Sequence, residues 1–171
     1  MKRNQMPWTI GLKLENEMRE NPVVEHRKVT LDCDVVTLSD DWLKTLFPND
    51  DPFIRTWDRR PGFSTMFPHW LICTYGIYLH TDQNYPDYCH HLVLRSDGFA
   101  LRGVDGQLSV MERGDYIVFH SKSPHELFPL TPDAKWYFAA SIDNDRHCPS
   151  SETIPLLLDY VQLKACEIPN G

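Results

Sequence analysis

The sequence predicts a mainly β domain, arranged as a double-sheet jelly roll with a few helices outside it. From residue 70 onward the chain runs through short segments rich in β-branched and aromatic residues, which favour strands. Turn signals such as SDG, VDG and TPDA separate these segments at intervals of about eight to twelve residues, as in sandwiches and small barrels. No helical pattern of about 10 to 15 residues lies between them, which argues against a sheet built from βαβ units.

Seven segments in this half of the chain are expected to be strands. They are WLICTYGIYL (70–79), HLVLR (91–95), FALRG (99–103), QLSVM (107–111), YIVFH (116–120), HELFPL (125–130) and KWYFAASI (135–142). All but the first have glycine, proline, aspartate or serine next to at least one end, the residue types that form tight turns. Together they supply enough strands for two facing sheets.

The N-terminal part of the chain is expected to be less regular. Apolar residues four apart predict a short helix over 10–20, and residues 24–38 have the pattern of an extended segment. Ser39 has the position of an N-cap, because two aspartates follow it in the first turn of a helix that runs to Leu46. The proline-rich stretch 48–69 is expected to be irregular.

The C-terminal segment ETIPLLLDYVQLKA (152–165) is predicted to be a helix, with Pro155 near its first turn, where proline is tolerated. No repeat, low-complexity tract or linker divides the chain, so a single domain over residues 1–171 is expected. Within it, 1–69 precedes the jelly-roll core at 70–142, and 143–171 forms a tail and helix.

Composition and charge limit the classes of function. The chain has 171 residues and a net charge of −7 with no long basic run, which disfavours nucleic-acid binding. No apolar run approaches the roughly 20 residues that span a bilayer, and no signal-peptide core is evident, so no membrane association is expected. The five cysteines are odd in number and form no C-x-x-C pair, which indicates reduced thiols and a cytoplasmic protein.

A histidine and an aspartate two residues apart suggest a metal site. His80 and Asp82, in the stretch YLHTD, follow a predicted strand and start on the same face. A third ligand is expected from the segment DYIVFHSKSPHEL, where His125 and His120 compete. Two histidines and one carboxylate on one face of an ion form the arrangement of non-haem Fe(II) oxygenases, which leaves three coordination positions open. His90 and His91 are adjacent, so at most one of them can face the same site.

Lys135 begins the apolar, aromatic segment KWYFAASI, where an ammonium group is costly unless an anion meets it. A dicarboxylate bound to the metal at one end would supply that anion at the other. The alternative is that the lysine extends its ammonium group to solvent at the strand edge.

These residues resemble the Fe(II)- and 2-oxoglutarate-dependent dioxygenases, and most closely the prolyl-4-hydroxylase-like branch. That family carries H-x-D, a G-x-x-x-x-F strand, a histidine six residues later and a basic residue about ten further on. The corresponding stretches here are HTD (80–82), GDYIVF (114–119), His125 and Lys135. The six-residue step selects His125 over His120. The resemblance covers about residues 70–142 and implies a cupin-type double-stranded β-helix.

The resemblance also implies roles for individual residues. Fe(II) would be held by His80, Asp82 and His125, and the distal carboxylate of 2-oxoglutarate would pair with Lys135. Tyr75 or Tyr78 would make a second contact to 2-oxoglutarate. Turnover would release succinate and CO₂ while a small molecule or an amino-acid or peptidyl side chain is hydroxylated, with ascorbate as a supporting reductant. Expected substrate-side walls are the aromatic residues Trp57, Trp70, Tyr85, Tyr88 and Phe99.

Two other classes of function remain open on the sequence alone. The first is a cupin-type metal-dependent isomerase or hydrolase that uses no 2-oxoglutarate and needs no Lys135 anchor. The second is a non-catalytic jelly-roll binding protein, in which His80 and Asp82 are ordinary loop residues. The identity of the substrate and the formation of a homo-oligomer also stay open, and the basic cluster Arg55, Arg59 and Arg60 fits a solvated loop as well as a phosphate contact.

Overall fold

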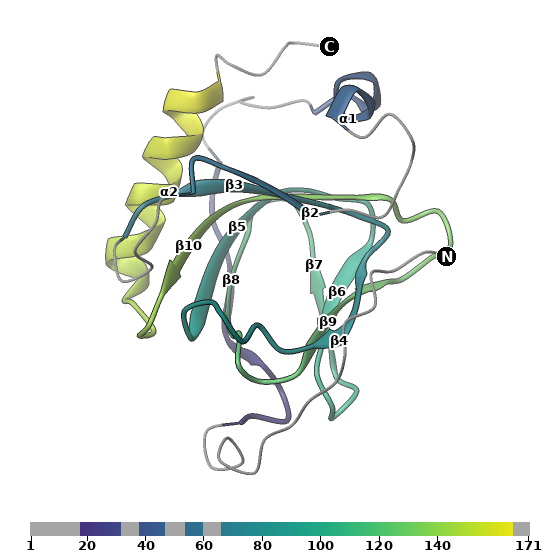
Figure 1. Cartoon of the computed structure of the whole chain (residues 1–171). Coiled ribbons are helices and arrows are strands. Elements are labelled where there is room, and N and C mark those ends of the chain that lie inside the picture. Colours follow the sequence, from purple (N-terminus) through teal and green to yellow (C-terminus); the bar gives the residue numbers. More distant parts are fainter. Residues whose placement is uncertain (1–17, 32–37, 47–53, 60–65, 166–171) are drawn as a thin grey trace.

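Two antiparallel sheets face each other in the computed structural model, which describes residues 18–31, 38–46, 54–59 and 66–165 (Figure 1). The larger sheet contains, in spatial order, β1 (Val23–Lys28), β8 (Asp115–His120), β5 (Tyr88–Ser96), β10 (Trp136–Asn144), β3 (His69–Thr74) and β2 (Ile54–Trp57). The smaller sheet contains β4 (Ile77–His80), β9 (His125–Pro129), β6 (Phe99–Arg102) and β7 (Leu108–Met111). Successive strands cross between the sheets, so the mainly β, jelly-roll-like prediction is confirmed.

The segment predicted as one strand over 70–79 is instead two strands in different sheets. Tyr75 and Gly76 both adopt positive φ angles, 63° and 90°, which turn the chain sharply between β3 and β4. The turn is fixed because the amide of Tyr75 donates a hydrogen bond of 2.8 Å to the carbonyl of Lys135 on the neighbouring strand. This corner carries the chain from the larger sheet to the smaller one.

The N-terminal half was predicted in part. The N-cap prediction is confirmed, because Ser39 Oγ accepts a hydrogen bond of 3.2 Å from the Trp42 amide at the start of α1 (Asp40–Leu46). In the extended segment 24–38, β1 ends at Lys28 and residues 32–37 lie outside the described residues. Most of the helix expected over 10–20 also lies outside them.

The expectation that 48–69 is wholly irregular was wrong, because Ile54–Trp57 forms β2 and His69 opens β3. The physical reason is tertiary. β2 completes its hydrogen bonds by pairing antiparallel with β3, from Ile54 opposite Cys73 to Trp57 opposite Trp70. The short segment lacks a strand pattern of its own and is ordered by that neighbour.

The larger sheet has a buried core on each face. Its outer face packs against α1 and α2 (Ser150–Lys164), which contribute Leu43, Ile154, Leu157 and Val161 to one cluster. Its inner face and the smaller sheet share a second cluster that includes Val93, Phe99, Ile117 and Leu127. In Figure 1, α2 lies alongside β10 and the space between the two sheets lies away from it. The predicted C-terminal helix is confirmed, and no helix among the described residues is long and apolar enough to cross a membrane.

Candidate metal centre

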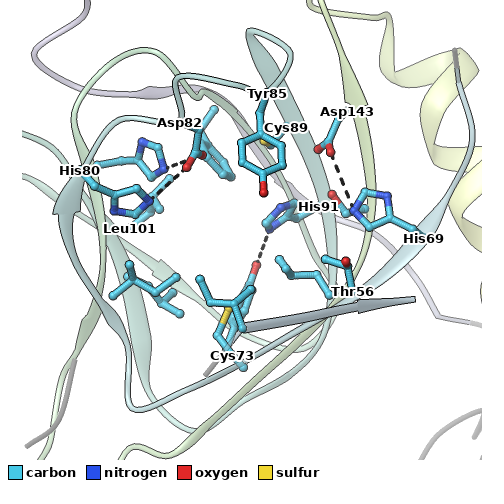
Figure 2. A pocket seen from close by; sticks show the side chains of 18 of the residues that line it. Thr56, His69, Cys73, His80, Asp82, Tyr85, Cys89, His91, Leu101 and Asp143 are labelled. Atoms are coloured by element: carbon cyan, nitrogen blue, oxygen red, sulfur yellow. Dashed lines mark hydrogen bonds and ion pairs between the residues drawn. The ribbon is translucent and has the colours of Figure 1, made fainter. Parts of the chain in front are cut away.

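The three predicted ligands come together at one end of the smaller sheet. His80 is the last residue of β4 and His125 the first of β9, and antiparallel pairing sets them directly opposite each other. Their imidazole ring centroids are 4.4 Å apart. Asp82 follows β4 by two residues and turns its carboxylate towards both rings (Figure 2). The choice of His125 over His120 agrees with this geometry.

An irregularity in β4 sets the direction of His80. Ile77 and His80 are three residues apart, so simple strand alternation would send their side chains to opposite faces. The pairing register between β4 and β9 shifts between these two residues, as at a β-bulge. Both side chains consequently line the same cavity.

The ligand atoms are close enough for a single ion. His80 Nε2 lies 3.3 Å from Asp82 Oδ1, and His125 Nε2 lies 3.2 Å from Asp82 Oδ2. One donor atom from each residue lies within 4.8 Å of the other two. Both histidines are buried and Asp82 is partly buried, so the three can hold a metal ion in a largely enclosed position.

The outer nitrogens of both imidazoles are fixed by the backbone. His80 Nδ1 donates to the carbonyl of Tyr78 at 2.5 Å, and His125 Nδ1 donates to the carbonyl of Ser123 at 2.8 Å. A carbonyl can only accept, so each Nδ1 carries a proton and each Nε2 presents a lone pair or an additional proton to Asp82. Lone pairs on both imidazoles facing a carboxylate would repel it. Either protons on the Nε2 atoms or a bound cation therefore lie between them and Asp82, and the donor set can hold a divalent metal ion.

Electrostatics in this cluster favour charge on His80 and Asp82. Burial opposes protonation of His80, but the hydrogen bond and charge of Asp82 raise its pKa above the ordinary value. Burial alone would raise the pKa of Asp82, yet the two imidazoles hold that pKa well below its usual range. A carboxylate that stays ionised when buried is suited to binding a cation.

Lys122 holds the backbone after Asp82, a role that the sequence did not indicate. Its ammonium group donates to the carbonyls of Asp82 at 2.6 Å and Gln83 at 3.1 Å, and also to that of Tyr85. The Asp82 amide donates to the carbonyl of Ser121 at 3.0 Å. The segment from Ser121 to Lys122 therefore fixes the loop that carries the carboxylate ligand.

A cavity of about 300 Å³ lies between the two sheets, and the three ligands form part of its wall. Much of its lining is apolar, contributed by both sheets, and consists of Leu71, Cys73, Ile77, Leu101, Met111, Phe119 and Leu127, together with Ile54 from β2. The Tyr85 side chain projects into it near Asp82 (Figure 2). Burial raises the pKa of Cys73 to about 12, so this thiol is neutral.

A second group of charged residues also lines the cavity. Arg59 Nη2 lies 2.9 Å from Asp143 Oδ2, and His69 Nε2 lies 3.9 Å from the same oxygen. The Arg59 guanidinium also stacks over the Tyr85 ring at 4.1 Å from its centroid. Arg59 thus belongs to the cavity wall, whereas Arg55 is exposed and Arg60 lies outside the described residues.

The remaining candidate histidines point in different directions, as their positions on the strands require. His91 lines the cavity, and its Nδ1 lies 2.8 Å from the Tyr137 hydroxyl. His90 faces the opposite side of the sheet, where it bonds the Ile142 carbonyl and the Cys148 amide. His120 bonds Ser123 Oγ at 2.7 Å. Neither His90 nor His120 is part of the metal-ligand group.

The expected 2-oxoglutarate contacts are not found in the cavity wall. Lys135, Tyr75 and Tyr78 are absent from its lining. The Lys135 ammonium lies 4.9 Å from the Trp136 ring centroid and 5.6 Å from that of Tyr75, so it is placed among aromatic rings at the β3–β4 corner. Tyr78 contributes through its carbonyl, which accepts from His80. A contact of these three side chains with 2-oxoglutarate therefore stays a prediction that the cavity lining does not support.

Of the five aromatic residues expected on the substrate side, Tyr85 lines the cavity. Trp70 lies on the outer face of the larger sheet and packs against Tyr160 at 4.9 Å between ring centroids. Tyr88 packs against His120, and Phe99 is buried in the inner core without lining the cavity. The side chain of Trp57 lies outside the described residues.

Comparison with known proteins adds little to this geometry. No protein-family model matches the chain, and no curated protein sequence is significantly similar to it. Among solved structures, the chain aligns with the plu4264 protein from Photorhabdus luminescens at a TM-score of 0.35 and 11% identity. The alignment covers 75% of this chain and 98% of that protein. Similarity at this level assigns neither a family nor an activity.

Proposed function

We propose that the chain is a mononuclear non-haem Fe(II) dioxygenase of the cupin-like, double-stranded β-helix type. One observation carries the proposal. Both Nδ1 atoms of the paired histidines are committed to backbone carbonyls, so both Nε2 atoms and the Asp82 carboxylate converge on one cation position. Two imidazoles and one carboxylate on one side of an ion match the facial arrangement of Fe(II) oxygenases.

In this proposal each residue has a defined task. His80 and His125 supply neutral nitrogen ligands and Asp82 supplies the charged one, while Lys122 and Ser121 hold the loop that bears Asp82. Bound iron would supply the activation of dioxygen. The apolar side chains of the lining limit the room for water in the cavity, and Tyr85 and Arg59 also line it.

2-Oxoglutarate is the co-substrate we propose first, because the ligand spacing resembles that of 2-oxoglutarate-dependent enzymes and the ligands stand at the ends of paired strands. Binding of its distal carboxylate requires a cation. Lys135 does not line the cavity, whereas Arg59 does. Arg59 is therefore the described cation best placed to serve this carboxylate.

A second candidate function is a cupin-type metal enzyme that uses no 2-oxoglutarate. It is favoured because Lys135 is absent from the lining and Arg59 is already paired with Asp143, and a buried carboxylate without a cationic partner of its own is costly. The two candidates share the metal site and differ only in the co-substrate. They are therefore separable by one binding measurement.

The test begins with metal-free protein, titrated anaerobically with Fe(II) and then with 2-oxoglutarate. A charge-transfer absorption band on adding 2-oxoglutarate, and succinate release on admitting air with ascorbate, are expected for the dioxygenase. Fe(II) binding without either signal would select the second candidate. Failure of the wild-type protein to bind Fe(II), Mn(II) or Zn(II) would reject both.

Lys135→Met and Arg59→Met are the matched variants for the distal carboxylate, because each replaces a cation with an apolar side chain of similar length. Arg59→Met should raise the 2-oxoglutarate concentration needed for half-saturation by about tenfold or more, with Fe(II) affinity unchanged. Lys135→Met should change it less than about twofold. The opposite order would show that Lys135 enters the cavity when the co-substrate binds.

A further inference from the structure

The cavity contains a polar pair that the metal site does not use. His91 on β5 and Tyr137 on β10 both line it, and His91 Nδ1 lies 2.8 Å from the Tyr137 hydroxyl. Both residues are almost fully buried, with 6% and 2% of their surface exposed. Figure 2 shows the bond between them, with His91 directed into the cavity below Tyr85.

The mutual bond leaves hydrogen-bonding capacity unused. If Tyr137 donates to Nδ1, then Nε2–H of His91 is an unused donor; if Nδ1–H donates, the Tyr137 hydroxyl proton is unused instead. In both cases an acceptor lone pair also remains. Within the described part of the chain, neither side chain makes another hydrogen bond. Both side chains line the cavity, so a water molecule or a polar group of a ligand there can take up the remaining donor and acceptor.

The surroundings of the pair decide the charge of that partner. Burial lowers the pKa of His91 to about 3, so the imidazole is neutral, and burial also raises the pKa of Tyr137 well above its ordinary value. The rings around it are uncharged, with the centroid of Phe119 5.1 Å from that of His91 and the centroid of Phe99 6.5 Å from that of Tyr137. A charged group would lose its hydration here without gaining an opposite charge.

We propose that His91 and Tyr137 form a subsite for an uncharged polar group of the substrate, such as an amide, a hydroxyl or a ketone. The inference rests on the proposed function in that the same substrate lies in the cavity bounded by the metal ligands. Given the cavity volume of about 300 Å³ and the apolar part of its lining, the substrate is a small molecule with an apolar portion. The pair orients it through one hydrogen bond, and a charged substituent would lose its hydration there without an opposite charge at the pair.

The test uses alkyl hydroxamates, whose two oxygens chelate the metal, with Mn(II)-loaded protein. Chains of varied length end in a carboxamide, an isopropyl group or a carboxylate, which have similar shapes and differ in polarity and charge. At the best length, the carboxamide should bind about tenfold more tightly than the isopropyl group, whereas the carboxylate also reports on Arg59. Tyr137→Phe, which removes only the hydroxyl, should reduce that preference to less than about twofold and leave Mn(II) affinity unchanged.

Tyr116→Phe is the control, because Tyr116 is equally buried but bonds Thr153 Oγ1 on the outer side of the sheet. It should retain the full preference for the carboxamide. A preference for the carboxamide over the isopropyl group that survives Tyr137→Phe would overturn the proposal. That result would mean that the pair bonds a retained water or is purely structural.

A measurement without metal separates this inference from the metal function. In metal-free protein labelled with ¹⁵N-histidine, butyramide should shift the His91 ring resonances, assigned with His91→Asn, and butyrate should not. Absence of that shift would overturn the subsite even if hydroxamates bind. Hydroxamates that bind no better with Mn(II) than without it would instead reject the metal site. The His91 resonance shift would then still support the subsite.

Discussion

The individual histidines of this chain have clearly different surroundings, and this allows each to be tested separately. His125 and His120 are five residues apart and both are buried, yet one faces the proposed ion and the other bonds Ser123. We expect His125→Ala to lower the affinity for Mn(II) or Fe(II) by more than about a hundredfold, because one of three ligands is lost. His120→Ala should change it less than about threefold, as measured by calorimetric titration. Equal losses would mean that the wrong histidine was assigned.

Lys122 gives a second test, because it acts on the metal only through the backbone. Lys122→Met keeps the aliphatic chain but removes the ammonium that three carbonyls accept from. Metal affinity should fall about tenfold to a hundredfold, since residues that orient a ligand have effects of this size.

The comparison for Lys122 is Lys28→Met, which removes an exposed lysine paired with Glu112 and Asp115 at the edge of the larger sheet. It should leave metal affinity within about twofold of wild type. If Lys122→Met lowers the free energy of unfolding but not metal affinity, then Lys122 stabilises the loop without positioning Asp82.

The strands of the larger sheet carry a pH-dependent contact at His90. Its Nδ1 donates to the Ile142 carbonyl on β10 at 3.0 Å, and its Nε2 accepts from the Cys148 amide at 3.1 Å. Only the second bond requires the neutral ring, because a protonated Nε2 cannot accept, and burial lowers the pKa of His90 to about 4. The bond from His90 to the chain leading to α2 is therefore made only while the ring is neutral.

The sign of the resulting pH effect follows from proton uptake. Between about pH 6.5 and 4 the unfolded histidine binds a proton that the folded one does not, so the free energy of unfolding falls as the pH is lowered through that range. The slope is at most about 1.4 kcal/mol per pH unit for one such group. Urea unfolding of metal-free protein at several pH values measures it. His90→Gln should reduce the slope by about one proton, and an unchanged slope would assign it to other groups.

The strands were largely predictable because each has its own pattern, and the exceptions have tertiary causes. β2 forms because it pairs with the edge of β3. The β3–β4 corner depends on a positive φ angle at Tyr75, and tyrosine is not a residue type from which such a turn is predicted. The triad was predictable because H-x-D and its distant histidine are a recognisable spacing. Lys122, Arg59 with Asp143, and His91 with Tyr137 are separated widely in sequence, so only the folded chain reveals them.

The two-sheet architecture explains why the site can be built from so few residues. The smaller sheet supplies the paired histidines at its end. The larger sheet supplies the other wall of the cavity, and its polar lining residues are His69, His91, Tyr137 and Asp143 on the strands and Arg59 just after β2. The helices pack on the outer face of the larger sheet, away from the cavity. Substitutions in the helix-covered core should therefore affect stability more than chemistry.

A metal ion bound to the folded state alone must stabilise the whole domain. His80, Asp82 and His125 converge only when β4 pairs with β9, so the unfolded chain has no comparable site. At a free metal concentration about a hundred times Kd, binding adds about 2.7 kcal/mol, which corresponds to a rise in Tm of about 5–10 °C for a chain of this size. Differential scanning calorimetry of metal-free protein, with Mn(II) or with a chelator, measures this shift. His125→Ala should lose most of it while His120→Ala retains it, and an equal rise in both variants would show that the ion stabilises the protein somewhere other than at the His80–Asp82–His125 group.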